Sequence, residues 1–205
     1  MNSAIIPIKG NAQPHFADDG MEYLHWEHLR PLARPDLTVY HPRTWKTKIR
    51  PLLLQLQRHD VQHVLFIGFS HGQAAIMEAA RLAPKYGIKT IRVVLCDPVW
   101  RSTWLPRISW MQALSVRSLM THPRIRIPDT VYRVDWCRQY VDFPRAHELV
   151  ADDPSKTIIG EPLVLPHPHS RIQWAEPWIE LAVDAANHFA NPPKAIPVSL
   201  RRHDH

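Results

Sequence analysis

Residues 64–72 read Val-Leu-Phe-Ile-Gly-Phe-Ser-His-Gly, and this stretch decides the fold. Its first four residues are apolar, which is typical of a buried strand, and residues 74–82 after it are mostly good helix formers. Between them lies a Gly-x-Ser-x-Gly sequence with Ser70 at its centre. The stretch therefore predicts a strand, a tight turn and a helix, with a serine at the apex of the turn.

The predicted turn would present the side chain of Ser70 for chemistry. A serine hydroxyl is a weak nucleophile that needs a base for its proton and donors for a developing oxyanion. Gly68 and Gly72 leave room where a Cβ would collide with a neighbouring strand or helix. The backbone N–H of His71 would lie at a helix N-terminus, which favours negative charge. The alternative is a serine that only caps the helix, but a cap does not need glycine on both sides.

Composition indicates one globular domain. The chain of 205 residues is 45% hydrophobic, which is enough for one substantial core. We expect residues 1–190 to form a single domain and residues 191–205 to form a C-terminal tail. Cys96 and Cys137 fall in or beside predicted strands, so buried free thiols are favoured over a disulfide.

Charge and hydropathy narrow the expected partners and location. The net charge of +6 hints at an acidic partner, but the basic residues are scattered and no nucleic-acid motif occurs. We interpret the charge as solubility with weak attraction to anionic surfaces. No apolar run approaches the ~20 residues that span a bilayer, and the N-terminus lacks the features of a signal peptide. The expectation is a cytoplasmic protein with no membrane span and no nucleic-acid partner.

The first half of the chain alternates predicted strands and helices. Strand patterns occur at residues 4–8, 37–40, 64–69 and 91–96, and helical patterns at residues 21–29, from Pro51 onward and at 74–83. This alternation predicts an α/β fold, with a mostly parallel central sheet and helices on both faces. Functional residues gather at the carboxyl ends of such strands. Ser70 and Asp97 both follow strands that are consecutive in the sequence.

The second half is less regular. Residues 100–121 are rich in Trp, Arg and Ser and predict a loop and short helix, which either lines a substrate pocket or belongs to the core. Residues 129–136 predict a strand, and residues 158–165 show no clear pattern. The loop of residues 166–170 reads Pro-His-Pro-His-Ser, and residues 174–189 predict a terminal helix.

The chain resembles the α/β-hydrolase family, as a small single-domain member similar to serine esterases and lipases. The resemblance covers residues 4–189 and rests on the Gly68–Gly72 motif in its strand-turn-helix setting, the nucleophile elbow. It implies triad partners in the order serine, acid, histidine. His169, in a loop before the final helix, matches the histidine best, and His167 is the alternative.

The resemblance also implies a triad acid and an oxyanion hole. Asp97 is the first choice for the acid and Asp142 the second, while Asp135 lies within a predicted strand and looks less available. The oxyanion donors would be the backbone N–H groups of His71 and of a residue near Asn11. The chain lacks the His-Gly-Gly-Gly string of many lipases.

The residue after the motif also departs from the family's pattern. Gln73 stands where many family members have glycine, and its bulkier side chain is expected to narrow the packing near the elbow. This departure weakens the resemblance to a standard lipase.

These features imply a serine hydrolase that cleaves carboxylic esters or thioesters of small molecules through an acyl-enzyme. The triad mechanism needs no metal or organic cofactor. A metal at His167 and His169 is also not expected, because these histidines lack clustered Asp, Glu or Cys partners. The alternatives are an acyltransferase or peptidase with the same triad, and a hydrolase-like binding protein without turnover. Nothing in the sequence indicates an oligomeric state.

Overall fold

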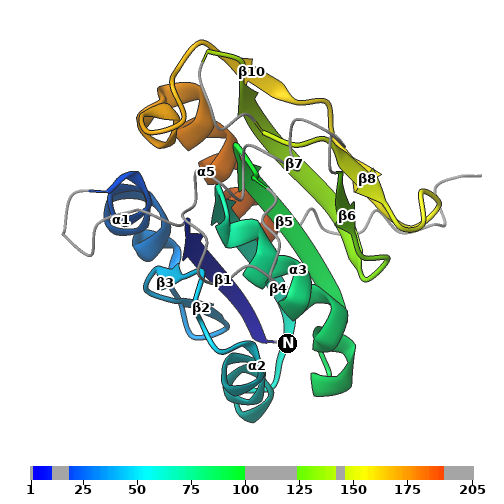
Figure 1. Ribbon diagram of the computed structural model, residues 1–205. Helices are drawn as coiled ribbons and strands as arrows, with labels where there is room; N and C mark the ends of the chain where they lie inside the picture. The colour runs from blue at the N-terminus through cyan, green and yellow to red at the C-terminus, as the bar shows by residue number, and fades with distance from the viewer. Residues whose placement is uncertain (1, 11–18, 100–123, 142–145, 192–205) are drawn as a thin grey trace, which may run out of the picture.

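A parallel β-sheet flanked by helices forms the body of the protein (Figure 1). The computed structural model describes residues 2–10, 19–99, 124–141 and 146–191. The main strands, in spatial order, are β10 (Leu163–Leu165), β7 (Val131–Gln139), β5 (Thr90–Cys96), β4 (Val61–Phe69), β1 (Asn2–Lys9) and β2 (Leu37–Val39). Every pairing between these strands is parallel. The predicted α/β class with a mostly parallel sheet is confirmed.

Several short strands escaped the sequence prediction. β3 (Arg43–Thr44) pairs with β1, and β9 (Ile158–Ile159) pairs with β7. A small second sheet joins β6 (Ile125–Ile127) to β8 (Leu149–Ala151). Strands of two or three residues are too short to show a period of two, so only the tertiary pairing reveals them.

The helices begin and end close to the predicted positions. They are α1 (Gly20–Tyr23), its continuations η1 (Leu24–Leu29) and η2 (Arg30–Leu32), α2 (Ile49–Arg58), α3 (Gly72–Leu82) with η3 (Ala83–Tyr86), η4 (Ile172–Trp174) and α5 (Glu176–Ala190). The prediction that the second of the expected helices begins at Pro51 is wrong, because α2 begins at Ile49. Proline fits anywhere in the first turn, where backbone N–H groups have no intrahelical partner.

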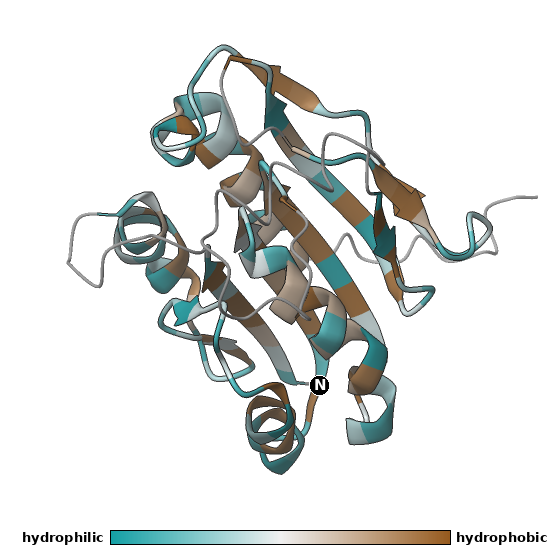
Figure 2. Cartoon of the chain, in the orientation of Figure 1, coloured by the Kyte–Doolittle hydropathy of each residue, from teal (hydrophilic) through white to brown (hydrophobic). Residues whose placement is uncertain are grey.

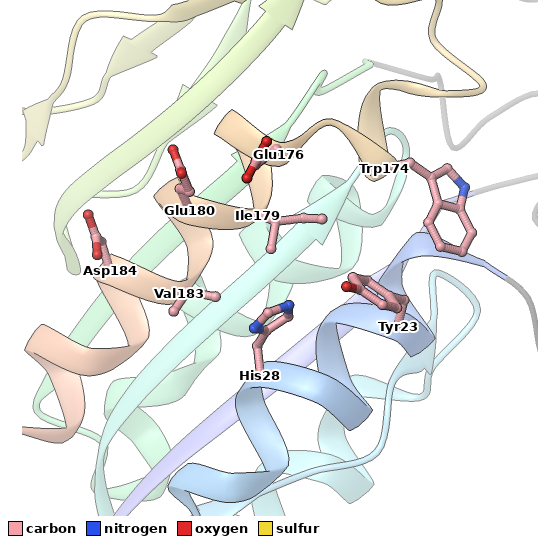
Figure 3. Close-up of a pocket in the computed structure, with 8 residues that line it drawn as sticks. All are labelled: Tyr23, His28, Trp174, Glu176, Ile179, Glu180, Val183 and Asp184. Carbon is pink, nitrogen blue, oxygen red and sulfur yellow. The ribbon is translucent and has the colours of Figure 1, made fainter.

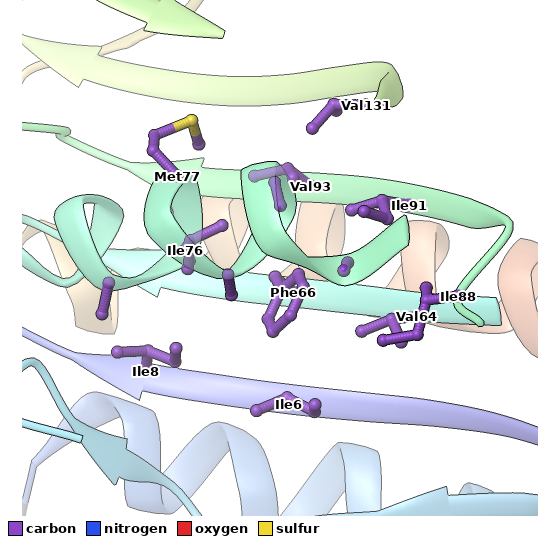
Figure 4. Close-up of a cluster of buried hydrophobic side chains, with 14 of the residues drawn as sticks. Ile6, Ile8, Val64, Phe66, Ile76, Met77, Ile88, Ile91, Val93 and Val131 are labelled. Carbon is purple, nitrogen blue, oxygen red and sulfur yellow. The ribbon is translucent and has the colours of Figure 1, made fainter. Parts of the chain in front are cut away.

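Two apolar clusters cover the two faces of the sheet. Successive strand residues point to opposite faces, so Ile6 and Phe66 pack on the side of α2 and α3 (Figure 4), whereas Ile5 and Leu65 pack on the side of η1 and α5. The central strands are mainly hydrophobic, whereas hydrophilic residues occur on the loops, on parts of the helices and along β7 (Figure 2). This two-sided burial explains the near-continuous apolar runs and confirms helices on both faces.

The strand order reverses beside the predicted serine. The chain runs from β1 outward to β2, then returns to place β4 on the other side of β1. In open α/β sheets, ligands bind outside the carboxyl ends of the strands at such a reversal. Gly10 follows β1 and Ser70 follows β4. The topology therefore directs attention to these two strand ends.

The two cysteines lie next to each other in the sheet. Cys96 on β5 and Cys137 on β7 are in register, both are buried, and their Sγ atoms are 3.5 Å apart. Burial raises the pKa of the Cys96 thiol well above its ordinary value, so it stays protonated. The prediction of buried free thiols is confirmed.

Candidate active site

Ser70 lies at a strained turn between β4 and α3. Its φ is 51°, a left-handed conformation that non-glycine residues rarely adopt. Its backbone N–H donates to the carbonyl of Cys96 at 2.9 Å. The predicted strand, tight turn and helix are present, since β4 ends at Phe69 and α3 begins at Gly72. The strained backbone turns the chain sharply at the serine.

The glycines around the turn allow close approach of neighbouring elements. A Cβ on Gly72 would lie 2.5 Å from the carbonyl oxygen of Ile8, and one on Gly68 would lie 2.5 Å from Cδ1 of Ile76. A Cβ on Gly10 would lie 2.8 Å from Cβ of Ser70. The end of β1 therefore packs directly against the elbow, and the flanking glycines leave the room that the sequence predicts.

His169 joins Ser70 to Asp97. Its Nε2 lies 2.9 Å from Oγ of Ser70, and its Nδ1 lies 2.5 Å from Oδ2 of Asp97. An ionised carboxylate only accepts hydrogen bonds, so the imidazole proton belongs on Nδ1. Nε2 then accepts the hydroxyl proton of Ser70. The three side chains form one continuous hydrogen-bonded series.

The carboxylate of Asp97 is held in place by the sheet. Asp97 follows β5, is 0% exposed and has a positive φ of 44°. Its backbone N–H donates to the carbonyl of Cys137 at 2.9 Å, and its Oδ1 accepts from the backbone N–H of Gln139 at 3.2 Å. The carboxylate thus receives hydrogen bonds on both oxygens, as a buried acceptor requires.

The imidazole of His169 is oriented by packing as well as by hydrogen bonds. The buried ring of Phe69 stacks against it, with the ring centroids 5.0 Å apart and the planes inclined by 24°. Phe69 is the variable residue before the serine in the Gly-x-Ser-x-Gly motif. The strand that presents Ser70 therefore also supports the ring beside it.

The other predicted site residues fall in different places. The structure brings His169, rather than the half-buried His167, to Ser70. His71 directly precedes α3, and its ring packs edge-on against Trp45 with the centroids 5.1 Å apart. Asn11 and Asp142 lie outside the described residues, as do residues 100–121.

Asp135 forms ion pairs with two arginines of the sheet. This agrees with the expectation that it is less available as the triad acid. Its carboxylate accepts from Arg92 at 2.7 Å and from Arg133 at 2.8–3.1 Å. Partial burial would raise the pKa of Asp135, but the hydrogen bonds and charges of these two arginines outweigh it and hold the pKa below its ordinary value. Asp135 is a structural carboxylate between β5 and β7.

Replacing Asp135 with asparagine is expected to lower the free energy of unfolding by about 2 kcal/mol at pH 7. Because the folded-state pKa is depressed, the ionised carboxylate stabilises the fold above about pH 4, and this contribution is lost as pH falls through the folded-state pKa. Urea unfolding at pH 7 and pH 3 measures the difference, which should shrink at pH 3. Asp129→Asn, in an exposed pair with Lys156, should cost less than about 1 kcal/mol. An equal loss for both variants would contradict this role.

Gln73 does more than fill space near the elbow. Its side chain is buried, and its Nε2 donates to the carbonyl of Val99 at 3.2 Å. Val99 in turn donates its backbone N–H to the carbonyl of Ser70 at 3.3 Å. The long side chain therefore ties the start of α3 to the segment after β5, a contact that glycine at this position could not make.

A buried charged cluster beside the site escaped the sequence analysis. Lys9, the last residue of β1, forms ion pairs with Asp19 at 2.8 Å and with Glu22, whose other oxygen lies 3.2 Å from Nε2 of His41. Burial lowers the pKa of Lys9, but the two carboxylates outweigh it and the net shift is upward. The sequence signal was present: Asp19 caps α1 and accepts from the backbone N–H of Glu22 at 2.9 Å, an Asp-x-x-Glu pattern at a helix start.

A separate groove of about 690 Å³ lies between η1 and α5. Figure 3 shows two aromatic side chains, Tyr23 and Trp174, at one end and carboxylates along α5. Its lining residues are Tyr23, His28, Trp174, Glu176, Ile179, Glu180, Val183 and Asp184. None of them belongs to the Ser70 series.

Within the described parts of the chain, no group of three or more His, Cys, Asp or Glu side chains is placed to hold a metal ion. No helix in those parts has the length and apolar character needed to cross a bilayer.

Comparison with known proteins adds no further assignment. No model of a known protein family matches this sequence, and no curated protein matches it. The case for a function therefore rests on the geometry around Ser70.

Proposed function

We propose that the protein is a serine hydrolase of the α/β-hydrolase type that cleaves carboxylic esters or thioesters. The hydrogen-bonded series Ser70–His169–Asp97 carries this proposal. Ser70 lies 99 residues before His169 in the sequence, and Asp97 lies 72 residues before it. The three side chains meet at the carboxyl edge of a parallel sheet. Nucleophile, base and orienting acid are the three roles that acyl transfer requires.

Each side chain has a defined role in the proposed reaction. Oγ of Ser70 attacks the acyl carbon while Nε2 of His169 takes the hydroxyl proton. Asp97 keeps the Nδ1–H oriented and stabilises the imidazolium that forms. His169 then returns the proton to the leaving group, and a water molecule activated by the same imidazole cleaves the acyl-enzyme.

The oxyanion that forms during attack needs backbone donors near the elbow. The N–H of His71, at the start of α3, is the first proposed donor, and helix N-termini favour negative charge. The second is proposed from the segment after β1, near Asn11. The close packing of Gly10 against Ser70 supports a donor from that direction.

Several features besides the contacts of the three side chains support an enzyme of the α/β-hydrolase type. The chain order serine, acid, histidine is that of α/β-hydrolases, and His169 lies between the last strand of the sheet and α5. The strained φ of Ser70 is the backbone signature of a nucleophile elbow. A binding protein without turnover would not need all three triad members in contact, so the complete series favours catalysis over that alternative.

Labelling with a fluorophosphonate probe tests the proposal. Wild-type protein should gain one covalent adduct, detected by intact mass, because the activated hydroxyl attacks the phosphorus atom and displaces fluoride. Ser70→Ala should gain none. Ser155→Ala, which removes an exposed serine in a turn with Asp153, should be labelled like wild type. An unlabelled wild type, or equal labelling of Ser70→Ala, would refute the serine-hydrolase proposal.

A further inference from the structure

Several segments of the chain carry positive charge without any acidic residue, and one of them reaches the edge of the sheet that holds the candidate active site. Residues 37–59, between Asp36 and Asp60, contain no Asp or Glu. Their basic residues are Arg43, Lys46, Lys48, Arg50 and Arg58. Four of these five fall within residues 43–50, which we call the basic segment. Residues 79–96 and 98–128 also lack Asp and Glu and contain four and five Lys or Arg residues, so it is the place of the basic segment in the fold, and not its composition, that sets it apart.

The basic segment starts at the edge of the sheet that holds the candidate active site. It begins in β3, where Arg43 pairs in register with Ile8 and Thr44 with Lys9, at the carboxyl end of β1. It ends in the first turn of α2. Lys46, Lys48 and Arg50 are exposed to solvent along it.

An aromatic contact links the basic segment to the nucleophile elbow. The ring of Trp45 packs against the ring of His71, the residue that follows Ser70, with the centroids 5.1 Å apart. Nζ of Lys46 lies 5.4 Å from the centroid of the Trp45 ring. Positive charge therefore lies within two side-chain contacts of the proposed oxyanion donor.

The cations of the basic segment are not used in ion pairs within the described structure. Among the described residues, Arg43, Lys46, Lys48 and Arg50 form no salt bridge, whereas Arg92, Arg126 and Arg133 on the sheets all do. Lys85 and Lys89, at the other edge of the sheet, likewise form none with the described residues, so these two exposed lysines are a suitable control. Nε of Arg43 is also buried without a hydrogen-bond partner in the described part of the chain. A buried guanidinium N–H normally has an acceptor.

The placement of two of these cations opposes local stability. Lys48 is the N-cap of α2 without a side-chain capping bond, Arg50 lies in the first turn, and that turn has no acidic residue. Cations at a helix N-terminus oppose the helix dipole, and acidic or capping residues are preferred there. Helix stability therefore does not explain the positive charge at this position.

We infer that the basic segment binds a negatively charged group, a carboxylate or phosphate, on the substrate whose acyl bond Ser70 cleaves. This inference rests on the proposed hydrolase function and specifies its substrate class. Arginine and lysine both bind carboxylate and phosphate oxygens, the former through a planar fork. The nearby carboxylates of Asp19 and Glu22 both pair with Lys9, which offsets part of their negative charge.

A matched pair of esters tests the inference. 4-Nitrophenyl butyrate is neutral, and the 4-nitrophenyl monoester of glutaric acid carries one carboxylate. In Lys46→Glu/Lys48→Glu, kcat/KM for the anionic ester should fall by about ten-fold at low salt, because attraction becomes repulsion. The value for the neutral ester should stay within a factor of about two, and 0.5 M NaCl should reduce the difference through screening.

The control is Lys85→Glu/Lys89→Glu, which reverses two exposed charges at the opposite, amino edge of the sheet. It changes the net charge equally and should leave the ratio of anionic to neutral kcat/KM near the wild-type value. Thermal unfolding of both variants checks that they fold. An equal fall in both variants would indicate a net-charge effect and overturn a site at the basic segment.

Further outcomes distinguish a failure of the anionic-substrate inference from a failure of the hydrolase proposal. If Ser70 is labelled and the neutral ester is cleaved, but the ratio is unchanged in Lys46→Glu/Lys48→Glu, only the anionic-substrate inference fails. The same holds if that variant loses co-sedimentation with phosphatidylglycerol vesicles while the ratio is unchanged, since the segment would then bind a membrane surface. If neither a neutral nor a carboxylate-bearing fluorophosphonate labels Ser70, the hydrolase proposal and this inference fail together.

Discussion

Replacing His169 with alanine is expected to lower kcat for ester hydrolysis by about 10⁶-fold, the loss typical when a triad base is removed. Nε2 of His169 is 2.9 Å from Oγ of Ser70 and is the group placed to take its proton. Without the imidazole, the hydroxyl stays protonated at neutral pH and attacks slowly. Steady-state hydrolysis of 4-nitrophenyl butyrate at saturating substrate measures kcat directly.

His167→Ala is the matched control for this change. His167 lies two residues earlier in the same loop and, like His169, directly follows a proline. It should retain nearly wild-type kcat, because the structure brings the other histidine to the serine. A large loss in His167→Ala with little change in His169→Ala would reverse the assignment of the base.

Replacing Asp97 with asparagine is expected to lower kcat by about 10⁴-fold. The carboxylate accepts the Nδ1–H of His169 at 2.5 Å and fixes the tautomer that leaves Nε2 free to accept a proton. An asparagine amide of the same shape can donate to Nδ1 instead, which stabilises the wrong tautomer and removes the charge that supports the imidazolium. The rate of fluorophosphonate labelling should fall together with kcat.

Two other carboxylates control for this result. Asp135→Asn removes a carboxylate that is paired with Arg92 and Arg133, so it should lower stability while leaving kcat of the folded protein almost unchanged. Asp142→Asn tests the other acid that the sequence offers. If Asp142→Asn lost about 10⁴-fold in kcat and Asp97→Asn did not, Asp97 would not be the triad acid.

The basic segment shows why charge has to be considered in three dimensions. Along the sequence its four cations look like part of a general excess of basic residues. In the structure, β3 pairs with the end of β1, and Trp45 packs against His71. Those two contacts bring the segment to the edge of the sheet that carries Ser70. If the inference holds, recognition of the substrate and attack on it are carried out by adjacent strand ends.

Local features of the sequence were sufficient for the elbow and for the class of fold. The apolar run ending at Phe69, the glycines on either side of Ser70 and the helix formers after Gly72 act through neighbouring residues. They predicted β4, the turn and α3. The alternation of strand and helix patterns likewise predicted a parallel sheet, because parallel strands need crossover connections.

Only the tertiary structure decided which residues meet at Ser70. His167 and His169 have similar local sequences, and Asp97, Asp135 and Asp142 all follow or lie in predicted strands. The contact of His169 with Ser70 spans 99 residues and that with Asp97 spans 72. Such contacts depend on strand order and register, which arise from packing between distant segments rather than from propensities of neighbouring residues. The sequence by itself therefore predicted that Ser70 lies at a sharp turn, because the turn depends on neighbouring residues. Only the fold placed His169 and Asp97 next to Ser70 and brought Trp45 of the basic segment against His71.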